Sequence, residues 1–445
     1  MNSLYRVITT LGVGITLSGL SVLSNLKPLL AQSQPAPQVD QASIKSAEKA
    51  YDAGLDYLEQ RDYPSALASF DQAIRANPSF ASAYLQRGLT HAAMENYSAA
   101  IADYNRALAI ADRAAEPTEP TPYVADVYLN RGVAKFYLDD NRGAITDFDR
   151  ALALNPELPP AYFYRALVYE KQGSPEMAIA DFTQAIELDD EYGDAYLNRG
   201  GLFYQTGNLP AALADLNQAV KLQPSVAAYY NRGFVYSALG AAEPALDDFN
   251  QAIQLDPNYS DAYLGRGLAL WKLDDQPAAL NDLETAMRLS PDKAELYKVR
   301  GDLRLETGDM EGAVADYDRA LAVRPNYAAV YKGRGDAYYE LGEMIAAIDD
   351  YSSFLAENPD DVDALTRRGE MLAEMGDFNG AMTDLTQAIR ANPRSADAYY
   401  NRGRLQASVG EPESAMADFQ RAANLYLQQG TAEGYRQTLV EMQSL

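Results

Sequence analysis

Apolar side chains recur at helical spacing along the chain, in paired segments on either side of a short break. The break often holds a glycine, such as Gly173, Gly207, Gly308 or Gly342. Glycine interrupts a helical pattern and favours a turn. The pattern therefore predicts pairs of antiparallel helices, repeated along an all-α chain.

One unit, written eleven times, accounts for this pattern. A small residue, usually the glycine of an Arg-Gly pair, marks the first helix of each copy, and most markers are 34 residues apart. The markers are Gly54, Gly88, Gly132, Ala166, Gly200, Gly233, Gly267, Gly301, Gly335, Gly369 and Gly403.

Other positions of the unit are fixed relative to the marker. Twelve residues after each marker stands an alanine, from Ala66 to Ala415, and sixteen residues after it an aromatic residue or a leucine. A tyrosine often stands four residues before the marker, and a proline usually closes the unit. Small residues allow two helices to cross closely, the tyrosine fills the adjoining space, and proline ends the second helix.

These features resemble the tetratricopeptide repeat family, whose unit is a helix-turn-helix of this length with a small residue in each helix and a closing proline. The resemblance covers about residues 45–425. It implies a right-handed superhelical solenoid in which the first helices line a concave groove. The usual function in that family is to hold a peptide or a protein segment there.

Ten units depart from the family pattern in the same way. An arginine stands directly before the marker, from Arg87 to Arg402, and an aspartate stands fifteen residues after it, from Asp103 to Asp418. The first unit has neither charge. We expect each arginine to bond an aspartate across neighbouring helices, within a unit or to the next one, as in Arg266 with Asp282 and Arg300 with Asp316. Each such bond contributes about 1–3 kcal/mol. Independent drift among the copies is the alternative.

A candidate groove follows from three first-helix positions that share one helical stripe: three before, one after and four after the marker. The family resemblance places this stripe on the concave wall. It is mainly apolar up to the unit of Gly267 and mainly polar or charged in the next three units. The apolar candidates are Leu85, Leu89, Leu129, Val133, Phe136, Phe163, Leu167, Leu197, Tyr204, Tyr230, Phe234, Leu264, Leu268 and Trp271.

Two interpretations of this stripe stay open. Either it binds an amphipathic or extended partner segment, or it is half-buried between neighbouring helices. Acids six residues before many markers favour a partner that carries Lys or Arg, although acids also suit the first turn of any helix. Some members of the family bind a C-terminal carboxylate with a lysine and an asparagine on this stripe. Here Asp302 and Asp336 stand where the asparagine is needed, so that clamp is not expected.

The segments outside the repeats have their own predictions. Residues 1–31 contain an uncharged apolar run, 7–23, and end on Ala31, which is typical of a cleaved signal peptide or of an N-terminal anchor. Residues 32–43 are a flexible Gln/Pro-rich linker, and 44–430 hold the repeats, with a loop insertion at 113–122. Residues 431–445 form an amphipathic capping helix. The body of the protein is therefore expected outside the cytoplasm, in the periplasm or an equivalent compartment.

Composition narrows the function. The chain has no cysteine, one histidine and a formal net charge of -26, with 37 Lys and Arg against 63 Asp and Glu. These numbers argue against thiolate chemistry, His-based sites and nucleic-acid binding. We expect no enzyme activity, no cofactor and no metal. Two functions remain: an exported scaffold for a protein or peptide segment with apolar and basic residues, or a self-associating envelope protein whose groove is filled by its own segment or a second copy.

Overall fold

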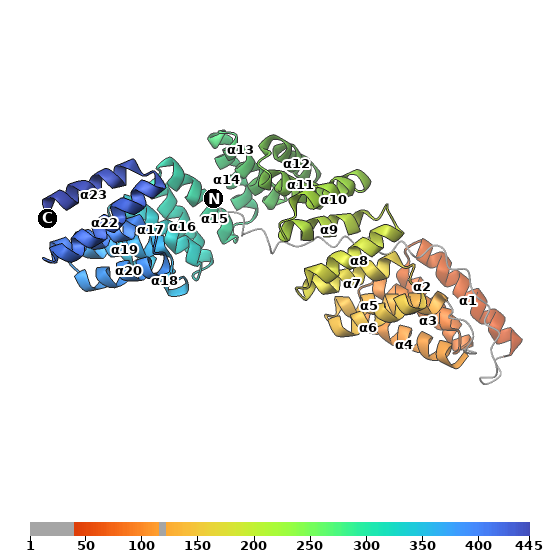
Figure 1. The fold of residues 1–445 in the computed structure, drawn as a ribbon. Helices are drawn as coiled ribbons and strands as arrows, with labels where there is room; N and C mark the ends of the chain where they lie inside the picture. The colour runs from red at the N-terminus through yellow and green to blue at the C-terminus, as the bar shows by residue number, and fades with distance from the viewer. Residues whose placement is uncertain (1–39, 115–121) are drawn as a thin grey trace. The chain divides into compact units, whose positions relative to one another are not determined.

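The computed structural model describes residues 40–114 and 122–445, and this part of the chain is helical, with no strand (Figure 1). The predicted signal peptide or anchor, linker residues 32–39 and most of the predicted insertion lie outside the described residues. The described chain falls into two compact units, 40–257 and 258–445. We call them the N-terminal unit and the C-terminal unit and describe each by itself.

The N-terminal unit consists of six helical hairpins that follow one another in chain order (Figure 1). Odd-numbered helices are the first helices of the repeats, and even-numbered helices are the second. The helices are α1 Gln41–Glu59, α2 Tyr63–Ala76, α3 Ala81–Ala93, α4 Tyr97–Ala114, α5 Pro122–Tyr137, α6 Asn141–Leu154, α7 Pro159–Lys171, α8 Pro175–Leu188, α9 Gly193–Gln205, α10 Leu209–Leu222, α11 Val226–Ala238 and α12 Ala242–Leu255.

The C-terminal unit consists of five further hairpins and one final helix. Its helices are α13 Ser260–Lys272, α14 Gln276–Leu289, α15 Ala294–Thr307, α16 Met310–Val323, α17 Ala328–Glu340, α18 Met344–Glu357, α19 Val362–Glu374, α20 Phe378–Ala391, α21 Ala396–Ser408, α22 Pro412–Gln429 and α23 Ala432–Ser444. The predicted solenoid of eleven helix-turn-helix units with a C-terminal capping helix is confirmed.

The tight turn inside each hairpin has a local cause. A residue with positive φ follows the first helix, most often a glycine such as Gly308 (φ 86°). Glycine adopts this conformation without a steric penalty. Several second helices then begin at a side-chain cap; the Asp309 carboxylate, for example, accepts a hydrogen bond from the Gly312 backbone N–H at 3.0 Å. Where such a cap is present, the turn and the cap together fix where the second helix starts.

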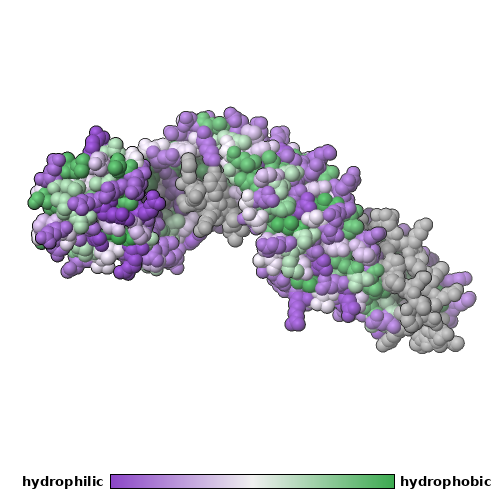
Figure 2. All heavy atoms as spheres, viewed as in Figure 1, coloured by the Kyte–Doolittle hydropathy of each residue, from purple (hydrophilic) through white to green (hydrophobic). Residues whose placement is uncertain are grey.

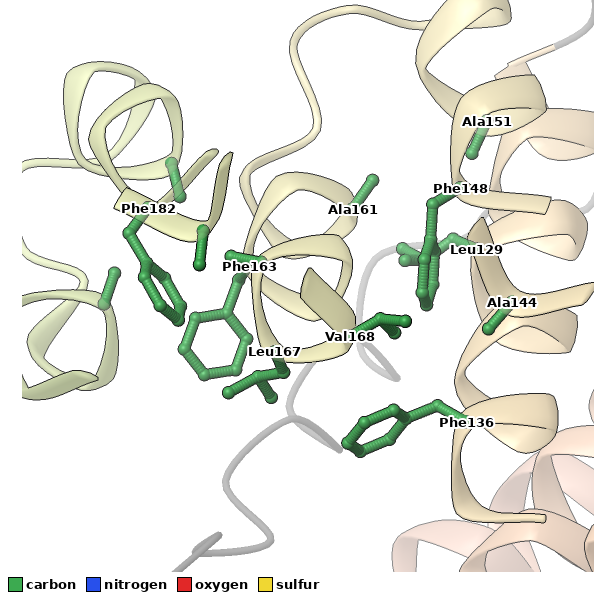
Figure 3. Close-up of a cluster of buried hydrophobic side chains, with 14 of the residues drawn as sticks. Leu129, Phe136, Ala144, Phe148, Ala151, Ala161, Phe163, Leu167, Val168 and Phe182 are labelled. Atoms are coloured by element: carbon green, nitrogen blue, oxygen red, sulfur yellow. The ribbon is translucent and has the colours of Figure 1, made fainter. Parts of the chain in front are cut away.

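The core of each hairpin forms where the small residues of the repeat meet the aromatic residue. The alanine twelve residues after the marker is fully buried in every unit. A Cβ placed on Gly132 would lie 2.6 Å from the Phe148 ring, so only glycine gives that ring its present position. Figure 3 shows Phe148 and Phe182 among the buried side chains of this core.

The final helix, α23, packs against α22. The Tyr426 ring lies so close to Gly434 that an added Cβ would meet it at 2.6 Å. Gly434 and Thr438 are buried, whereas Arg436, Gln437 and the other residues of the opposite face are exposed. This helix therefore covers the apolar edge of the last hairpin with a mostly polar surface.

Candidate functional site

The arginine and the aspartate of the repeat bond each other within one unit. In all ten units the guanidinium donates two hydrogen bonds, from Nε and Nη2, to the two carboxylate oxygens, with distances of 2.5–2.9 Å. Arg266 bonds Asp282 with two contacts of 2.7 Å, and Arg300 bonds Asp316 at 2.8 and 2.5 Å. The aspartate side chains are at most 10% exposed. The predicted pairing is thus a bidentate, partly buried ion pair inside each hairpin.

The same arginines also link consecutive units, which the sequence pattern did not reveal. In nine units their third guanidinium nitrogen, Nη1, meets an acceptor on the second helix of the preceding unit, seventeen residues after that unit's marker. The Arg334 Nη1–Asp318 Oδ1 distance is 2.5 Å, and the Arg368 Nη1–Ser352 Oγ distance is 2.9 Å. The same link joins Arg87 to Asp71, Arg131 to Asn105, Arg165 to Asp149, Arg199 to Thr183, Arg232 to Asn217, Arg300 to Glu284 and Arg402 to Thr386.

Tyrosine rings complete the surroundings of these arginines. The Arg131 guanidinium lies 5.2 Å from the centre of the Tyr128 ring, and Arg334 lies between Tyr331 and Tyr338 at 5.7 and 5.8 Å. Bonding to Asp350 is the main cause that raises the pKa of Arg334, which stays charged. The arrangement is structural, because each guanidinium bonds the buried aspartate of its own repeat and most also contact the preceding repeat.

The apolar stripe proposed as a groove is largely part of the core. Ten of its fourteen side chains are at most 9% exposed: Leu85, Leu89, Leu129, Phe136, Phe163, Leu167, Leu197, Tyr230, Phe234 and Leu264. The Phe163 ring centre lies 5.6 Å from that of Phe182 on its own second helix, and Phe234 lies 5.3 Å from Phe249 (Figure 3 for the first pair). The stripe leans onto the second helix of the same hairpin, so these ten side chains leave a ligand almost no surface. The packing alternative accounts for them.

Four members of the stripe remain half-buried: Val133, Tyr204, Leu268 and Trp271. On the face seen in Figure 2, hydrophobic residues likewise lie scattered among polar ones. The N-terminal part of the predicted groove is therefore not a continuous oily surface.

The charged part of the stripe differs from the apolar part, because its side chains are accessible to solvent and form ion pairs with one another. We call Lys298, Asp302, Lys332, Asp336, Arg367, Glu370, Arg404 and Glu441 the polar ladder; they lie on α15, α17, α19, α21 and α23. Except for Lys298, these side chains are between 23% and 45% exposed. Six of the eight residues occupy stripe positions, whereas Arg367 and Glu441 lie outside the stripe.

Ion pairs of the polar ladder run from one first helix to the next. Arg367 on α19 lies 3.8 Å from Asp336 on α17, and Lys332 on α17 bonds Asp361, the N-cap of α19, at 3.0 Å. Arg404 on α21 lies 3.8 Å from Glu370 and 3.9 Å from Glu441. Contacts of this length between half-exposed groups are weak and exchange readily with other partners.

Tyrosines anchor the acids of the polar ladder from below. Tyr317 donates a hydrogen bond to Asp302 at 2.9 Å, and Tyr351 donates one to Asp336 at 2.5 Å. Burial raises the pKa of Asp336, against the opposing effects of Tyr351 and Arg367. Burial likewise raises the pKa of Glu370, against the charge of Arg404. These carboxylates are held in place while part of their hydration is lost, which favours exchange of solvent for a charged ligand group.

Other kinds of site were sought in the part of the chain that the structure describes. It contains no group of three or more His, Asp or Glu residues placed to hold a metal ion. Nor does any helix in residues 40–114 and 122–445 have the length and apolar character needed to cross a membrane.

Comparison of the chain with protein-family models gives matches to repeat families. Family models described as "TPR repeat" or "Tetratricopeptide repeat" match residues 51–115, 132–173, 165–227, 226–259, 301–342, 333–385, 369–410 and 396–429. A search of curated proteins finds no match.

Solved structures of repeat proteins are similar to parts of the chain. MamA is 25% identical over 37% of this chain and 96% of its own, with a TM-score of 0.35. A tetratricopeptide repeat protein from Parabacteroides merdae is 20% identical over 66% of this chain and 99% of its own, with a TM-score of 0.39. Yeast Tom70 is 17% identical over 90% and 95%, with a TM-score of 0.38. Taken with the eleven hairpins, the family matches show that this chain belongs to the tetratricopeptide repeat family.

Proposed function

We propose that this chain is an exported scaffold that holds a segment of another protein along the first helices of its repeats. The observation that supports the proposal is the polar ladder, where charged side chains of three consecutive first helices, α17, α19 and α21, and of α23 lie half-exposed and are joined by ion pairs of 3.0–3.9 Å. A bound segment gains charge-assisted bonds there without opening the core. Export rests on the apolar N-terminal run followed by Ala31.

The chemistry of the partner follows from the side chains that are accessible. Asp363, beside the polar ladder on α19, is 58% exposed, and Arg404 is 45% exposed. A partner that presents a basic side chain to Asp363 and an acidic one to Arg404 complements both. Of the apolar candidates in the C-terminal unit, only Leu268 and Trp271 are half-buried rather than buried, so charge contributes more to recognition there than apolar contact does.

The test must leave the core intact. Phe234 is 3% exposed, so a charged substitution there would unfold a hairpin rather than weaken a ligand. Asp363→Arg combined with Arg404→Glu reverses two accessible charges instead. The matched control is Glu433→Arg combined with Arg436→Glu on the outer face of α23, where both side chains are over 70% exposed.

Affinity capture with the mature protein, followed by mass spectrometry, gives the readout. We expect a partner that is retained by wild type and by the control and lost from the polar-ladder variant. Equal retention by both variants contradicts the proposal. Light scattering on the same samples identifies the alternative, because a self-associating chain would form dimers that the polar-ladder variant loses. Export is tested separately by the N-terminus of the secreted protein, which we expect at Gln32.

A further inference from the structure

A second accessible surface lies at the turns between first and second helices. In the last three repeats these turns and the first residues of the second helices expose large apolar side chains: Ile345 is 67% exposed, Met375 51%, Phe378 44% and Val409 42%. The three turns join α17 to α18, α19 to α20 and α21 to α22. Because successive hairpins of a solenoid stack in register, their turns lie along one edge of the C-terminal unit.

The charges on this edge are all of one sign. Six exposed acids flank the apolar side chains: Glu340, Glu343, Glu374, Asp377, Glu411 and Glu413. No Lys or Arg occurs in 337–347, 371–383 or 405–417. Every other hairpin turn of the chain either contains a Lys or Arg or has at most one acid. We call the four apolar residues and six acids of the last three repeats the acidic edge.

The acidic edge is also sterically open. Gly342, Gly376 and Gly410 form its turns with positive φ, and a Cβ on any of them would meet no atom within 4 Å. Packed helices are about 10 Å apart, so three consecutive turns span roughly 20 Å. That length corresponds to about 14 residues of helix.

We propose that the acidic edge docks a basic amphipathic helix of a partner protein. The apolar face of that helix covers Ile345, Met375, Phe378 and Val409, and its Lys and Arg side chains pair with the six flanking acids. Exposed apolar side chains grouped in this way mark interaction sites. The six flanking acids favour a basic occupant.

Other occupants fit less well. A second copy of the chain in a two-fold arrangement would bring two sets of six acids face to face. A membrane surface rich in anionic lipid would be repelled by the same acids. The basic helix is the occupant that satisfies both the apolar residues and the charges.

A synthetic probe tests this proposal on the full mature chain. The probe is an 18-residue fluorescein-labelled helix with leucine on one face and lysine on the other, and its affinity is measured by fluorescence anisotropy. Met375→Ser combined with Val409→Ser removes two apolar contacts of the acidic edge. Leu138→Ser combined with Leu239→Ser is the matched control, because these residues occupy the same place in their repeats and are 47% and 46% exposed.

We expect the edge variant to weaken binding about tenfold or more and the control to change it less than about twofold. A second pair of variants tests the charges: Glu343→Gln, Glu374→Gln and Glu411→Gln on the edge, against Glu95→Gln, Glu157→Gln and Glu243→Gln elsewhere. Both triple variants lose the same charge, so general attraction to an acidic protein affects them equally. Only the edge triple should lose affinity.

Several results would overturn the proposal. One is equal weakening by the edge and control variants, which shows non-specific binding. Another is equal affinity for a probe in which glutamate replaces lysine. A third is a concentration-dependent dimer, seen by light scattering, that the edge variant abolishes, because the occupant would then be a second copy. Circular dichroism and urea denaturation confirm that each variant is folded.

Discussion

Removal of one member of an arginine–aspartate pair should cost far more than removal of the neighbouring surface acid. Arg334 donates two hydrogen bonds of 2.7 Å to Asp350, whose side chain is 6% exposed, and one of 2.5 Å to Asp318, whose side chain is 54% exposed. Burial raises the pKa of Asp350 in spite of Arg334, because the carboxylate has lost part of its hydration.

The magnitudes follow from this difference in burial. Arg334→Ala leaves the Asp350 carboxylate buried without its arginine, at a cost of about 3–4 kcal/mol. Asp350→Ala leaves a guanidinium that is 19% exposed and still bonded to Asp318, so we expect about 2–3 kcal/mol. The double variant should cost about 2 kcal/mol less than the sum. Asp318→Ala should cost under about 1 kcal/mol.

Two measurements check these values together. Urea denaturation followed by Trp271 fluorescence reports on the C-terminal unit, because Trp271 is the only tryptophan and lies in α13. Hydrogen exchange of the α17 and α18 amides reports on the hairpin itself. Additive losses, with a coupling below about 0.5 kcal/mol, would refute the reasoning. So would a loss for Asp318→Ala as large as that for Asp350→Ala.

Three further predictions use matched positions of the repeat. Gly200→Ala should destabilise the protein by about 1–3 kcal/mol, because the added Cβ meets Leu216 at 2.9 Å. Gly201→Ala should stabilise α9 by up to about 1 kcal/mol, because its Cβ would meet no atom within 4 Å. Thermal unfolding distinguishes the two variants, and equal effects would contradict the argument that the helices cross closely at Gly200. Tyr104→Phe should stabilise the protein by about 1 kcal/mol, because the fully buried Tyr104 hydroxyl has no hydrogen-bond partner among the described residues. Tyr317→Phe should destabilise it by about 1 kcal/mol, because the hydrogen bond to Asp302 is lost. A shift of the urea midpoint in the same direction for both variants would disprove this. Burial raises the pKa of Asp336 and of Glu370, so the folded chain binds a proton at each carboxylate more tightly than the unfolded chain does. The contribution of the two carboxyl groups to stability should therefore increase as the pH falls through their raised folded pKa values toward the ordinary carboxyl range. Asp336→Asn with Glu370→Gln should therefore gain less stability, or lose more, than wild type between pH 7 and about pH 4.5, and parallel pH profiles would argue against it.

The repeat itself could be predicted from the sequence, because the marker, the alanine and the aromatic residue recur at fixed distances. At these distances the two small residues let the helices of a hairpin cross closely around the aromatic ring. The pairing of Arg266 with Asp282 could be predicted because the first unit lacks both the arginine and the aspartate at the corresponding positions. The link from Arg334 to Asp318 could not be found in this way, because its acceptor varies among Asp, Asn, Thr, Glu and Ser from unit to unit. Only the seventeen-residue distance from the preceding marker is constant.

The candidate groove was harder to predict for a physical reason. A helical stripe predicts the direction in which the Phe163 and Phe234 side chains point from their own helices. It does not predict how far a neighbouring helix covers these side chains. Their burial depends on Phe182 and Phe249 sixteen residues after the marker, which fill the space beneath. Where the stripe residue is aspartate, as in Asp302 and Asp336, a tyrosine hydroxyl meets it instead. These correlated pairs were visible in the sequence but had no meaning until the contact was known.

The arginine's third nitrogen gives the array a direction. In nine hairpins the arginine contacts an acceptor on the hairpin before it, whereas Ala53 stands at this place in the first hairpin and has no such group. Loss of hairpins from the beginning of the array would leave a guanidinium without its acceptor. Loss of a hairpin near the end, with α23 kept as the cap, would leave only an acceptor side chain unpaired, and that side chain would return to water. Growth or loss of hairpins is therefore expected to be tolerated unequally at the two ends, even though the hairpins themselves are nearly interchangeable.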